Sequence, residues 1–213
     1  MTSRPLPTLE TVRQALALPD FDAESAWRKM APRPRALNRA PQRTGAARPA
    51  GVLILLYPKE GQWTFVLTRR TENLRHHRGQ ISLPGGRLEA GETVVEAALR
   101  ETCEELSVCL DESVILGQLT QAYLPVSDYN VTPVVATVDH RPTFIPDPNE
   151  VAAVHEMTLA MLVDDGSKVE EPWTFEGFEL EVPYYRVEEQ AVWGATAIML
   201  SEFEWRLRSV LNI

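Results

Sequence analysis

The stretch from residue 86 to residue 108 reads GRLEAGETVVEAALRETCEELSV and joins a glycine to a helical pattern rich in glutamate. At 100° per residue, its pattern predicts a helix from about Thr93 to Ser107. One wedge of that helix is apolar and is expected to face the core; it holds Val95, Ala98, Leu99, Thr102, Cys103 and Leu106. Glu101, Glu104 and Glu105 fall within about 100° of each other on a different face.

This acidic face needs a cause outside the helix itself. Like charges spaced three or four residues apart destabilise an isolated helix, and acids near a helix C-terminus also oppose the helix dipole. A bound divalent cation such as Mg²⁺ offers a reason, because it takes oxygen ligands from carboxylates. From the helix alone, a solvated acidic surface is an equally open interpretation.

The spacing of this stretch resembles the signature of the Nudix hydrolases. That signature is a glycine, five residues, Glu, seven residues, Arg-Glu, two residues and Glu-Glu. The matching positions are Gly86, Glu92, Arg100, Glu101, Glu104 and Glu105. Two positions depart from it: Thr102 replaces an aliphatic residue, and Ser107 stands where glycine is usual. A left-handed helix cap favours glycine, so Ser107 is expected to lower stability or alter the cap.

The resemblance implies a fold, a cofactor and a set of roles. The fold is α+β, the Nudix fold, with a mixed β-sheet layered between helices in an α/β/α sandwich. The cofactor is Mg²⁺ or Mn²⁺, held by Glu101 and Glu105 with Glu104 sharing a second ion or a water. Arg100 orients these glutamates and Glu92 supports the loop before the helix. The general base stays open between Glu105 and Glu150, which follows Pro146-Asp-Pro-Asn.

A second motif lies directly upstream and concerns the substrate. Residues 66–86, VLTRRTENLRHHRGQISLPGG, resemble the motif of the coenzyme A pyrophosphatase subfamily. The matching positions are Leu67, Thr68, Arg70, Arg75, Gly79, Pro84, Gly85 and Gly86. The resemblance implies cleavage of coenzyme A (CoA) or acyl-CoA to 3′,5′-ADP and (acyl-)4′-phosphopantetheine. Arg70 and Arg75 suit phosphate binding, and Gly85-Gly86 permits a tight turn and close approach to phosphate.

Other interpretations of these motifs stay open. The chain could hydrolyse another nucleoside diphosphate derivative, such as ADP-ribose, or a nucleoside triphosphate. It could also be a Nudix-fold binding module without activity, although every charged position of the signature is present. His76 and His77 suit polar lining of the basic stretch better than metal binding.

The rest of the chain predicts a domain preceded by an arm. Residues 1–50 read as a basic arm with one or two helices, one capped by Thr8 and one near Asp22–Met30, followed by a proline-rich linker. The arm contributes no motif residue and is expected to be dispensable for the catalytic centre. Residues 51–213 form the Nudix domain. Its expected strands are 52–57, 63–68, 79–83, 114–119 and 129–138. A helical or mixed segment is expected at 150–162, a β-rich segment at 173–185 and a helix at 195–211.

Composition limits the partners. The formal net charge is −9, with about +5 in residues 1–50 and therefore about −14 in the rest. Such a balance argues against general nucleic-acid binding. No apolar run reaches the ~20 residues of a membrane span. Cys103 and Cys109 are interpreted as free thiols in a reducing cytoplasm. The expected partner is a small-molecule substrate, with a homodimer left open.

Overall fold

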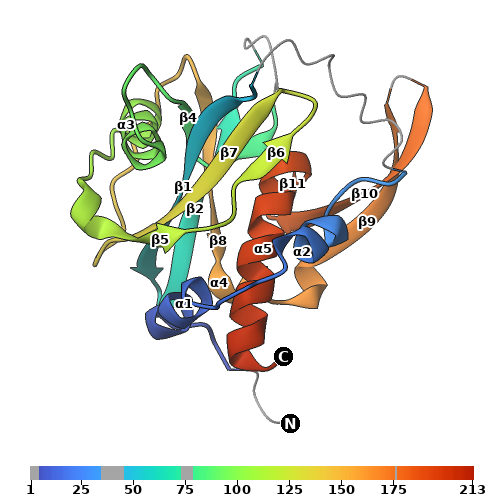
Figure 1. Ribbon diagram of the computed structural model, residues 1–213, viewed down its shortest axis with the longest axis horizontal. Coiled ribbons are helices and arrows are strands. Elements are labelled where there is room, and N and C mark those ends of the chain that lie inside the picture. Colours follow the sequence, from blue (N-terminus) through green and yellow to red (C-terminus); the bar gives the residue numbers. More distant parts are fainter. Residues whose placement is uncertain (1–4, 35–45, 73–78, 176) are drawn as a thin grey trace.

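The computed structural model describes residues 5–34, 46–72, 79–175 and 177–213. Within these residues an eight-stranded sheet has the path β3-β2-β1-β7-β5, with β4 on β1, β6 on β7 and β8 on β2. Helix α3 covers one face, and the long helix α5 lies on the other with α1 and α2 against it (Figure 1). The predicted α/β/α layering of a mixed sheet is confirmed.

The middle of the sheet follows the predicted hairpin. Strand β1 (Arg48–Lys59) pairs antiparallel with β2 (Gln62–Arg70) and parallel with β7 (Tyr129–Thr137). Residues of β1 alternate between two cores: Leu53 and Leu55 pack with α3, whereas Ile54 and Leu56 pack on the α5 side. Because both faces are covered there, residues 52–57 of the strand are apolar without a break. The strand begins before the expected domain boundary at residue 50.

The remaining elements frame this centre. They are β3 (Ile81–Ser82), β4 (Gly85–Arg87), α3 (Val94–Leu106), β5 (Ile115–Gln118), β6 (Ala122–Leu124), β8 (Val151–Thr158), α4 (Leu159–Leu162) and α5 (Gly194–Leu211). Two short 3₁₀ turns cover Glu112–Val114 and Asp165–Ser167. A separate three-stranded sheet joins β9 (Lys168–Phe175), β10 (Phe178–Val187) and β11 (Gln190–Val192).

Helix α3 begins and ends as its sequence predicts. Thr93 and Glu96 form a reciprocal capping box at its start, so two otherwise free backbone N–H groups are satisfied. Ser107 closes it in the left-handed region with φ 57°. Gly51 lets the helix lie directly on β1, because a β-carbon there would stand 2.1 Å from the carbonyl oxygen of Val94.

The N-terminal arm is folded where the structure describes it. Helix α1 (Leu9–Leu16) is capped by Thr8, as expected. Helix α2 (Ala23–Lys29) lies within the expected second helix and is capped by Asp22. Both pack on α5, and Val12 and Met30 are buried in the core on that face. The proline-rich linker falls largely in 35–45, outside the described residues. The arm is therefore part of the core while contributing no motif residue.

Three predictions about local structure need correction. The segment 150–162 is mainly a strand, β8, because it completes the sheet by pairing with β2; only Leu159–Leu162 are helical. Gly85-Gly86 does not form a free turn but part of β4, which pairs with Gly51 and Val52 of β1. Cys103 and Cys109 are not free thiols, because the fold brings their Cα atoms to 4.4 Å and joins them in a disulfide.

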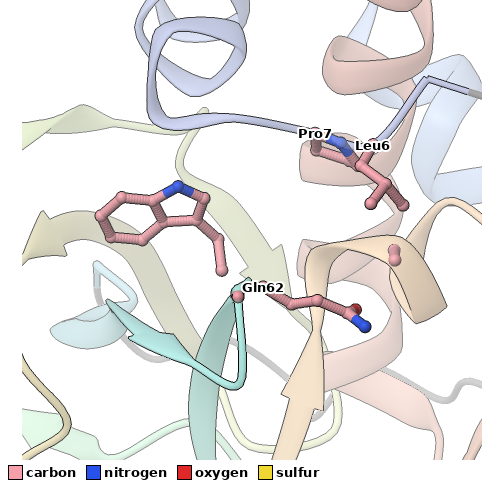
Figure 2. Close-up of a pocket in the computed structure, with 6 residues that line it drawn as sticks. Leu6, Pro7 and Gln62 are labelled. Carbon is pink, nitrogen blue, oxygen red and sulfur yellow. The ribbon is translucent and has the colours of Figure 1, made fainter.

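One hollow lies far in the fold from the acidic helix. It has a volume of about 20 Å³ and lies between Leu6 and Pro7 of the arm and Gln62 at the β1–β2 turn (Figure 2). Ligand pockets usually enclose about 300–1,000 Å³, so this hollow is too small for a nucleotide. No helix among the described residues is long and apolar enough to cross a membrane.

Candidate active site

Arg100 is the centre of an ionic cluster on α3. Its Nε donates to Glu92 Oε1 at 2.7 Å, and its Nη1 donates to Glu101 Oε1 at 3.0 Å and Glu104 Oε2 at 3.1 Å. Its Nη2 donates to the carbonyl of Arg87 at 3.1 Å. One guanidinium thus joins the loop before the helix to two glutamates of the signature.

Glu92 holds the loop that leads into α3. Its Oε2 accepts the backbone N–H of Glu89 at 2.7 Å while its other oxygen binds Arg100. These two bonds lower the pKa of Glu92, with the bond from Arg100 the larger cause. The carboxylate therefore stays charged and acts as a structural tie, in agreement with its predicted support of the loop.

Gly85 and Gly86 place the main chain of β4 directly against two of the carboxylates. A β-carbon at Gly86 would stand 2.4 Å from the carboxyl carbon of Glu101. The backbone N–H of Gly85 bonds to the Glu105 carboxylate. Gly85 also has φ 141°, a conformation that glycine adopts readily. The strand at this point has no room for any larger residue. Close packing therefore requires glycine at both positions, in addition to their predicted contact with substrate.

Glu105 is a buried acid whose carboxylate is only partly paired with donors and positive charge. Only 3% of its surface is exposed, and its Oε2 has no hydrogen-bond partner among the described residues. Arg70 at the end of β2 stands 3.8 Å from its other oxygen. Burial raises the pKa of Glu105 to about 8; Arg70 opposes that rise, and the charges of Glu101 and Glu150 add to it.

Glu101 and Glu150 complete the charged group. Burial raises the pKa of Glu101, against the bond from Arg100, and Glu104 and Glu150 raise it further. Glu150 ends the turn that begins at Asp147, and its carbonyl accepts the N–H of Thr71 at 3.0 Å. Strand β8 follows Glu150 directly, so Glu150 does not cap a helix. The fold thus brings a distant loop within electrostatic reach of the signature helix.

The carboxylates suit a hard cation in chemistry, although the ligand set is incomplete as it stands. Among the described residues, no three His, Cys, Asp or Glu side chains converge on one point. Glu104 is 58% exposed and is directed to Arg100. The unpaired oxygen of Glu105 and the repulsion among Glu101, Glu105 and Glu150 nevertheless fit a divalent ion. Mg²⁺ usually takes one or two carboxylates and completes its shell with water and substrate phosphates.

The structure gathers part of the predicted site. Glu101, Glu105, Arg70, Gly85 and Gly86 meet at one end of the sheet, with Glu150 nearby. Arg75, His76 and His77 lie outside the described residues. Two contacts had no signal in the sequence: the Arg87 carbonyl, which binds Arg100, and the backbone N–H of Asp147, which donates to the carbonyl of Glu105 at 2.9 Å. Main-chain groups carry no residue-type pattern, so only the fold reveals them.

A glycine-rich strand facing a capped helix with this glutamate set defines the Nudix class of domain. The profile of the NUDIX domain matches residues 47–176, and the chain therefore belongs to the Nudix family. It is 34% identical over 168 residues to Nudix hydrolase 3 of Caenorhabditis elegans, covering 71% of this chain and 70% of that protein. It is 33% identical over 145 residues to the Nudix hydrolase NudL of Pectobacterium atrosepticum, covering 65% and 72%.

Solved structures agree on the fold. A MutT/nudix family protein from Enterococcus faecalis superposes with a TM-score of 0.53 at 17% identity, covering 98% of this chain and 81% of that one. Because the overlap includes nearly the whole chain, the fold likeness extends beyond the region that the domain profile matches.

Proposed function

We propose that this Nudix protein is a metal-dependent pyrophosphohydrolase that cleaves the diphosphate of CoA or acyl-CoA. The products would be 3′,5′-ADP and (acyl-)4′-phosphopantetheine. Two features support the proposal. The first is the placement of the buried Glu105 and the half-buried Glu101 beside the main chain of Gly85-Gly86. The second is the stretch 66–86 that resembles the CoA subfamily motif and brings Arg70 within 3.8 Å of Glu105.

The observation that carries the proposal is the unpaired buried oxygen of Glu105. An unpaired buried carboxylate oxygen costs stability unless a ligand compensates it. Glu101 and Glu105 would hold Mg²⁺ or Mn²⁺, with Glu104 contributing through water from its exposed flank. A bound divalent ion neutralises phosphate charge and lowers the pKa of a bound water.

The other side chains serve binding and proton transfer in this proposal. Arg100 positions Glu101 and Glu104, and Arg70 binds a phosphate of the pyrophosphate. Arg75 would contact an outer phosphate, and Gly85-Gly86 allows close approach of substrate. Of the two candidate bases, Glu150 is favoured here, because Glu105 is enclosed and is better used as a ligand. Glu150 is only half-buried and ends a loop, so it can face a water next to the substrate.

A substrate comparison tests this function. The full chain is assayed with Mg²⁺ and with Mn²⁺ on CoA, acyl-CoA, ADP-ribose and nucleoside triphosphates, and the products are separated by chromatography. We expect 3′,5′-ADP from CoA at the highest kcat/KM. Faster turnover of ADP-ribose or a triphosphate would assign the alternative substrate class. Binding of CoA without turnover of any compound would support the non-catalytic module.

Size-exclusion chromatography with light scattering tests the assembly. A homodimer is our proposal for the assembly. A single monomer peak across protein concentrations would reject it.

A further inference from the structure

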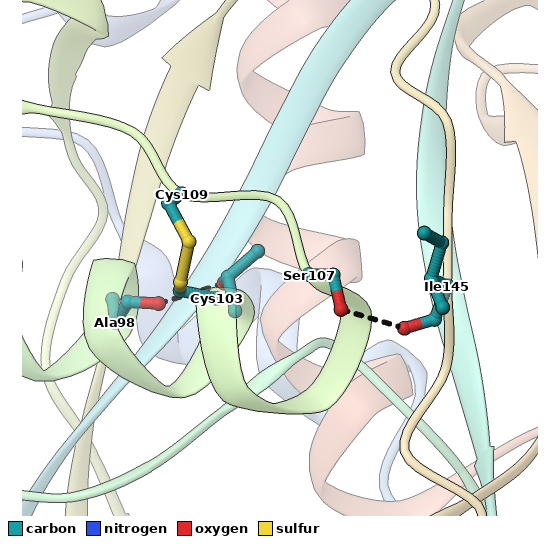
Figure 3. Close-up of a disulfide and its surroundings, with 6 residues drawn as sticks. Ala98, Cys103, Ser107, Cys109 and Ile145 are labelled. Atoms are coloured by element: carbon teal, nitrogen blue, oxygen red, sulfur yellow. Dashed lines mark hydrogen bonds between the residues drawn. A yellow bond between two sulfur atoms is a disulfide. The ribbon is translucent and has the colours of Figure 1, made fainter.

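The Cys103–Cys109 disulfide lies at the end of the helix that carries the site. Cys103 belongs to α3, beside Glu104 and Glu105, and Cys109 follows the helix cap (Figure 3). Their Cα atoms are 4.4 Å apart, a separation that a disulfide spans without movement of the backbone. The two cysteines are six positions apart, so the bridge encloses only the helix cap.

The enclosed cap contains Ser107, whose backbone conformation is unfavourable for a residue with a β-carbon. Ser107 has φ 57°, where a β-carbon is disfavoured and glycine is the usual residue. Its N–H donates to the carbonyl of Cys103 at 2.9 Å, and its hydroxyl donates to the carbonyl of Ile145 at 3.1 Å. A cross-link from Cys103 to Cys109 limits the conformations open to this cap when it frays. The bridge therefore offsets the absence of glycine.

The same cap connects the two acidic parts of the site. The carbonyl of Leu106 accepts the N–H of Ile145 at 2.9 Å, and the carbonyl of Glu105 accepts the N–H of Asp147 at 2.9 Å. The segment from Ile145 to Asp147 leads into the turn that ends at Glu150. Loosening of the last turn of α3 would therefore move Glu105 and Glu150 relative to each other.

Reductants can reach the bridge. Cys109 is exposed and Cys103 is half-buried. Both line a hollow of about 440 Å³ on the outer side of α3, together with Leu99, Leu110 and Arg100. A small thiol reductant can thus reach the bridge from this hollow, whose lining also includes Glu92 and Arg100 of the candidate active site.

We propose that Cys103 and Cys109 form a reversible redox site that sets the order of the α3 cap and, through it, the geometry of Glu105. In the step, a dithiol reductant donates two electrons and two protons. The S–S bond breaks, both cysteines become thiols, and the reductant becomes a disulfide. The reverse exchange with a disulfide oxidant restores the bridge. The consequence for catalysis rests on the proposed function; the consequence for the cap does not.

The test begins with the full-length, metal-free protein. Thiol alkylation and mass spectrometry are run before and after dithiothreitol treatment, followed by glutathione-disulfide reoxidation. We expect both cysteines to resist alkylation in the untreated protein and to be alkylated after dithiothreitol treatment. After reoxidation they should resist alkylation again. We expect reduction to lower Tm by roughly 4–10 °C. Amide hydrogen exchange should accelerate at Glu104–Val108 and stay unchanged in α5. Thiols that stay free after reoxidation would overturn the proposal.

Variants separate the bridge from a general effect of reductant. Cys103→Ser/Cys109→Ser should melt like the reduced wild type and ignore dithiothreitol. Ser107→Gly should narrow the Tm difference between the two redox states, because glycine needs less support in this cap. A Tm difference that persists in the cysteine-free variant would contradict the bridge as its cause.

The catalytic consequence is measured on the same samples. Reduction should raise the half-saturating Mg²⁺ concentration for CoA hydrolysis by roughly tenfold, because supporting contacts tune metal affinity. If the oxidised and reduced proteins differ in Tm but show the same Mg²⁺ dependence, the bridge only stabilises the fold. That result would overturn the proposed redox control of Glu105. If CoA is not hydrolysed while the thiols, Tm and exchange respond, the proposed function fails and the redox control of the cap stands.

Discussion

The indole N–H of Trp27 donates to Glu202 Oε2 over 3.2 Å, so the N-terminal arm pairs with a fully buried carboxylate of α5. Glu202 also accepts from Thr120 and from Arg206, whose guanidinium reaches the carbonyl of Ala15. Loss of one donor leaves part of a buried charge unsatisfied, which costs about 1–3 kcal/mol. We expect Trp27→Phe to lower Tm by roughly 2–10 °C and leave kcat on CoA unchanged.

Thermal melting and steady-state kinetics of the same preparation check this prediction. Leu6→Ala is a suitable control, because Leu6 is 59% exposed. A deletion of residues 1–46 should destabilise far more than Trp27→Phe, because it removes Val12 and Met30 from the core. A loss of kcat in folded Trp27→Phe would contradict the expectation that the arm is dispensable for catalysis.

Glu101 and Glu105 of α3 are expected to be essential for turnover. Glu101→Gln and Glu105→Gln should each reduce kcat on CoA by about two orders of magnitude or more, because an amide removes the anionic oxygen that binds the cation. Glu96→Gln provides a matched change on the same helix. It is exposed, and glutamine can keep the capping box with Thr93. Near-normal Mg²⁺-dependent rates in either test variant would remove that residue from the proposed ligand set.

The stability of metal-free protein should depend on pH through Glu105. Its folded pKa of about 8 lies above the ordinary value of 4.5, so the folded state holds the proton more tightly. This contribution to stability is present below about pH 4.5 and is lost as pH rises through about 8. Glu105→Gln should therefore gain Tm relative to wild type as pH increases from 5 to 9.

Melting curves with a chelator at several pH values measure the difference. Added Mg²⁺ or Mn²⁺ should then stabilise the wild type more than Glu105→Gln at pH 8, because only the wild type offers the charged ligand. A Tm difference that stays constant between pH 5 and 9 would contradict a strongly raised pKa for Glu105.

Sequence patterns predict local structure correctly in segments where one periodicity dominates. The bounds of α3 near Thr93 and Ser107 and the glutamate face of this helix follow from local rules. The segment 150–162 was ambiguous, because its apolar run suits both a helix and a strand. Pairing with β2, about eighty residues earlier, decides in favour of a strand. Local propensity carries no information on such distant partners.

The disulfide and the burial of Glu105 could not be predicted from the sequence either, because both depend on how the folded chain is arranged in space. Cys103 and Cys109 come together only because Ser107 reverses the chain. The signature spacing places Glu101, Glu104 and Glu105 on one helix face but does not rank their exposure. Packing of α3 against β1 and β4 buries Glu105 and leaves Glu104 exposed.

A second pH effect should come from Glu156 on β8. Burial alone would raise its pKa, but hydrogen bonds from Arg141, Lys59 and Tyr57 outweigh burial and lower it to about 2. Its contribution to stability is therefore present above about pH 4.5 and is lost as pH falls towards 2. Glu156→Gln should lower stability at pH 7 and lose that difference near pH 2.

Urea denaturation at pH 7, 4 and 3 follows this loss. Glu24→Gln is the matched control, because Glu24 pairs with Arg28 on the surface, where ion pairs contribute little. Equal destabilisation by Glu156→Gln at all three pH values would assign its role to packing and not to charge.

The last prediction concerns Arg70 and the part of the substrate that it binds. Arg70 ends β2 and stands 3.8 Å from Glu105, so a phosphate that it contacts lies beside this buried carboxylate. This position favours the pyrophosphate over the outer 3′-phosphate. A charge-assisted contact contributes about 1.5–3 kcal/mol, so Arg70→Ala should lower kcat/KM for CoA by roughly ten- to a hundredfold.

Dephospho-CoA lacks the 3′-phosphate and therefore separates the two positions. Arg70→Ala should penalise CoA and dephospho-CoA alike. Arg75→Ala is the companion variant: if Arg75 binds the outer phosphate, its loss should penalise CoA by a similar factor and dephospho-CoA much less. A selective loss on CoA for Arg70→Ala would move Arg70 to the outer phosphate. Unchanged kinetics for both variants would mean that the basic stretch does not bind substrate, because removing a phosphate contact cannot leave kcat/KM unaltered.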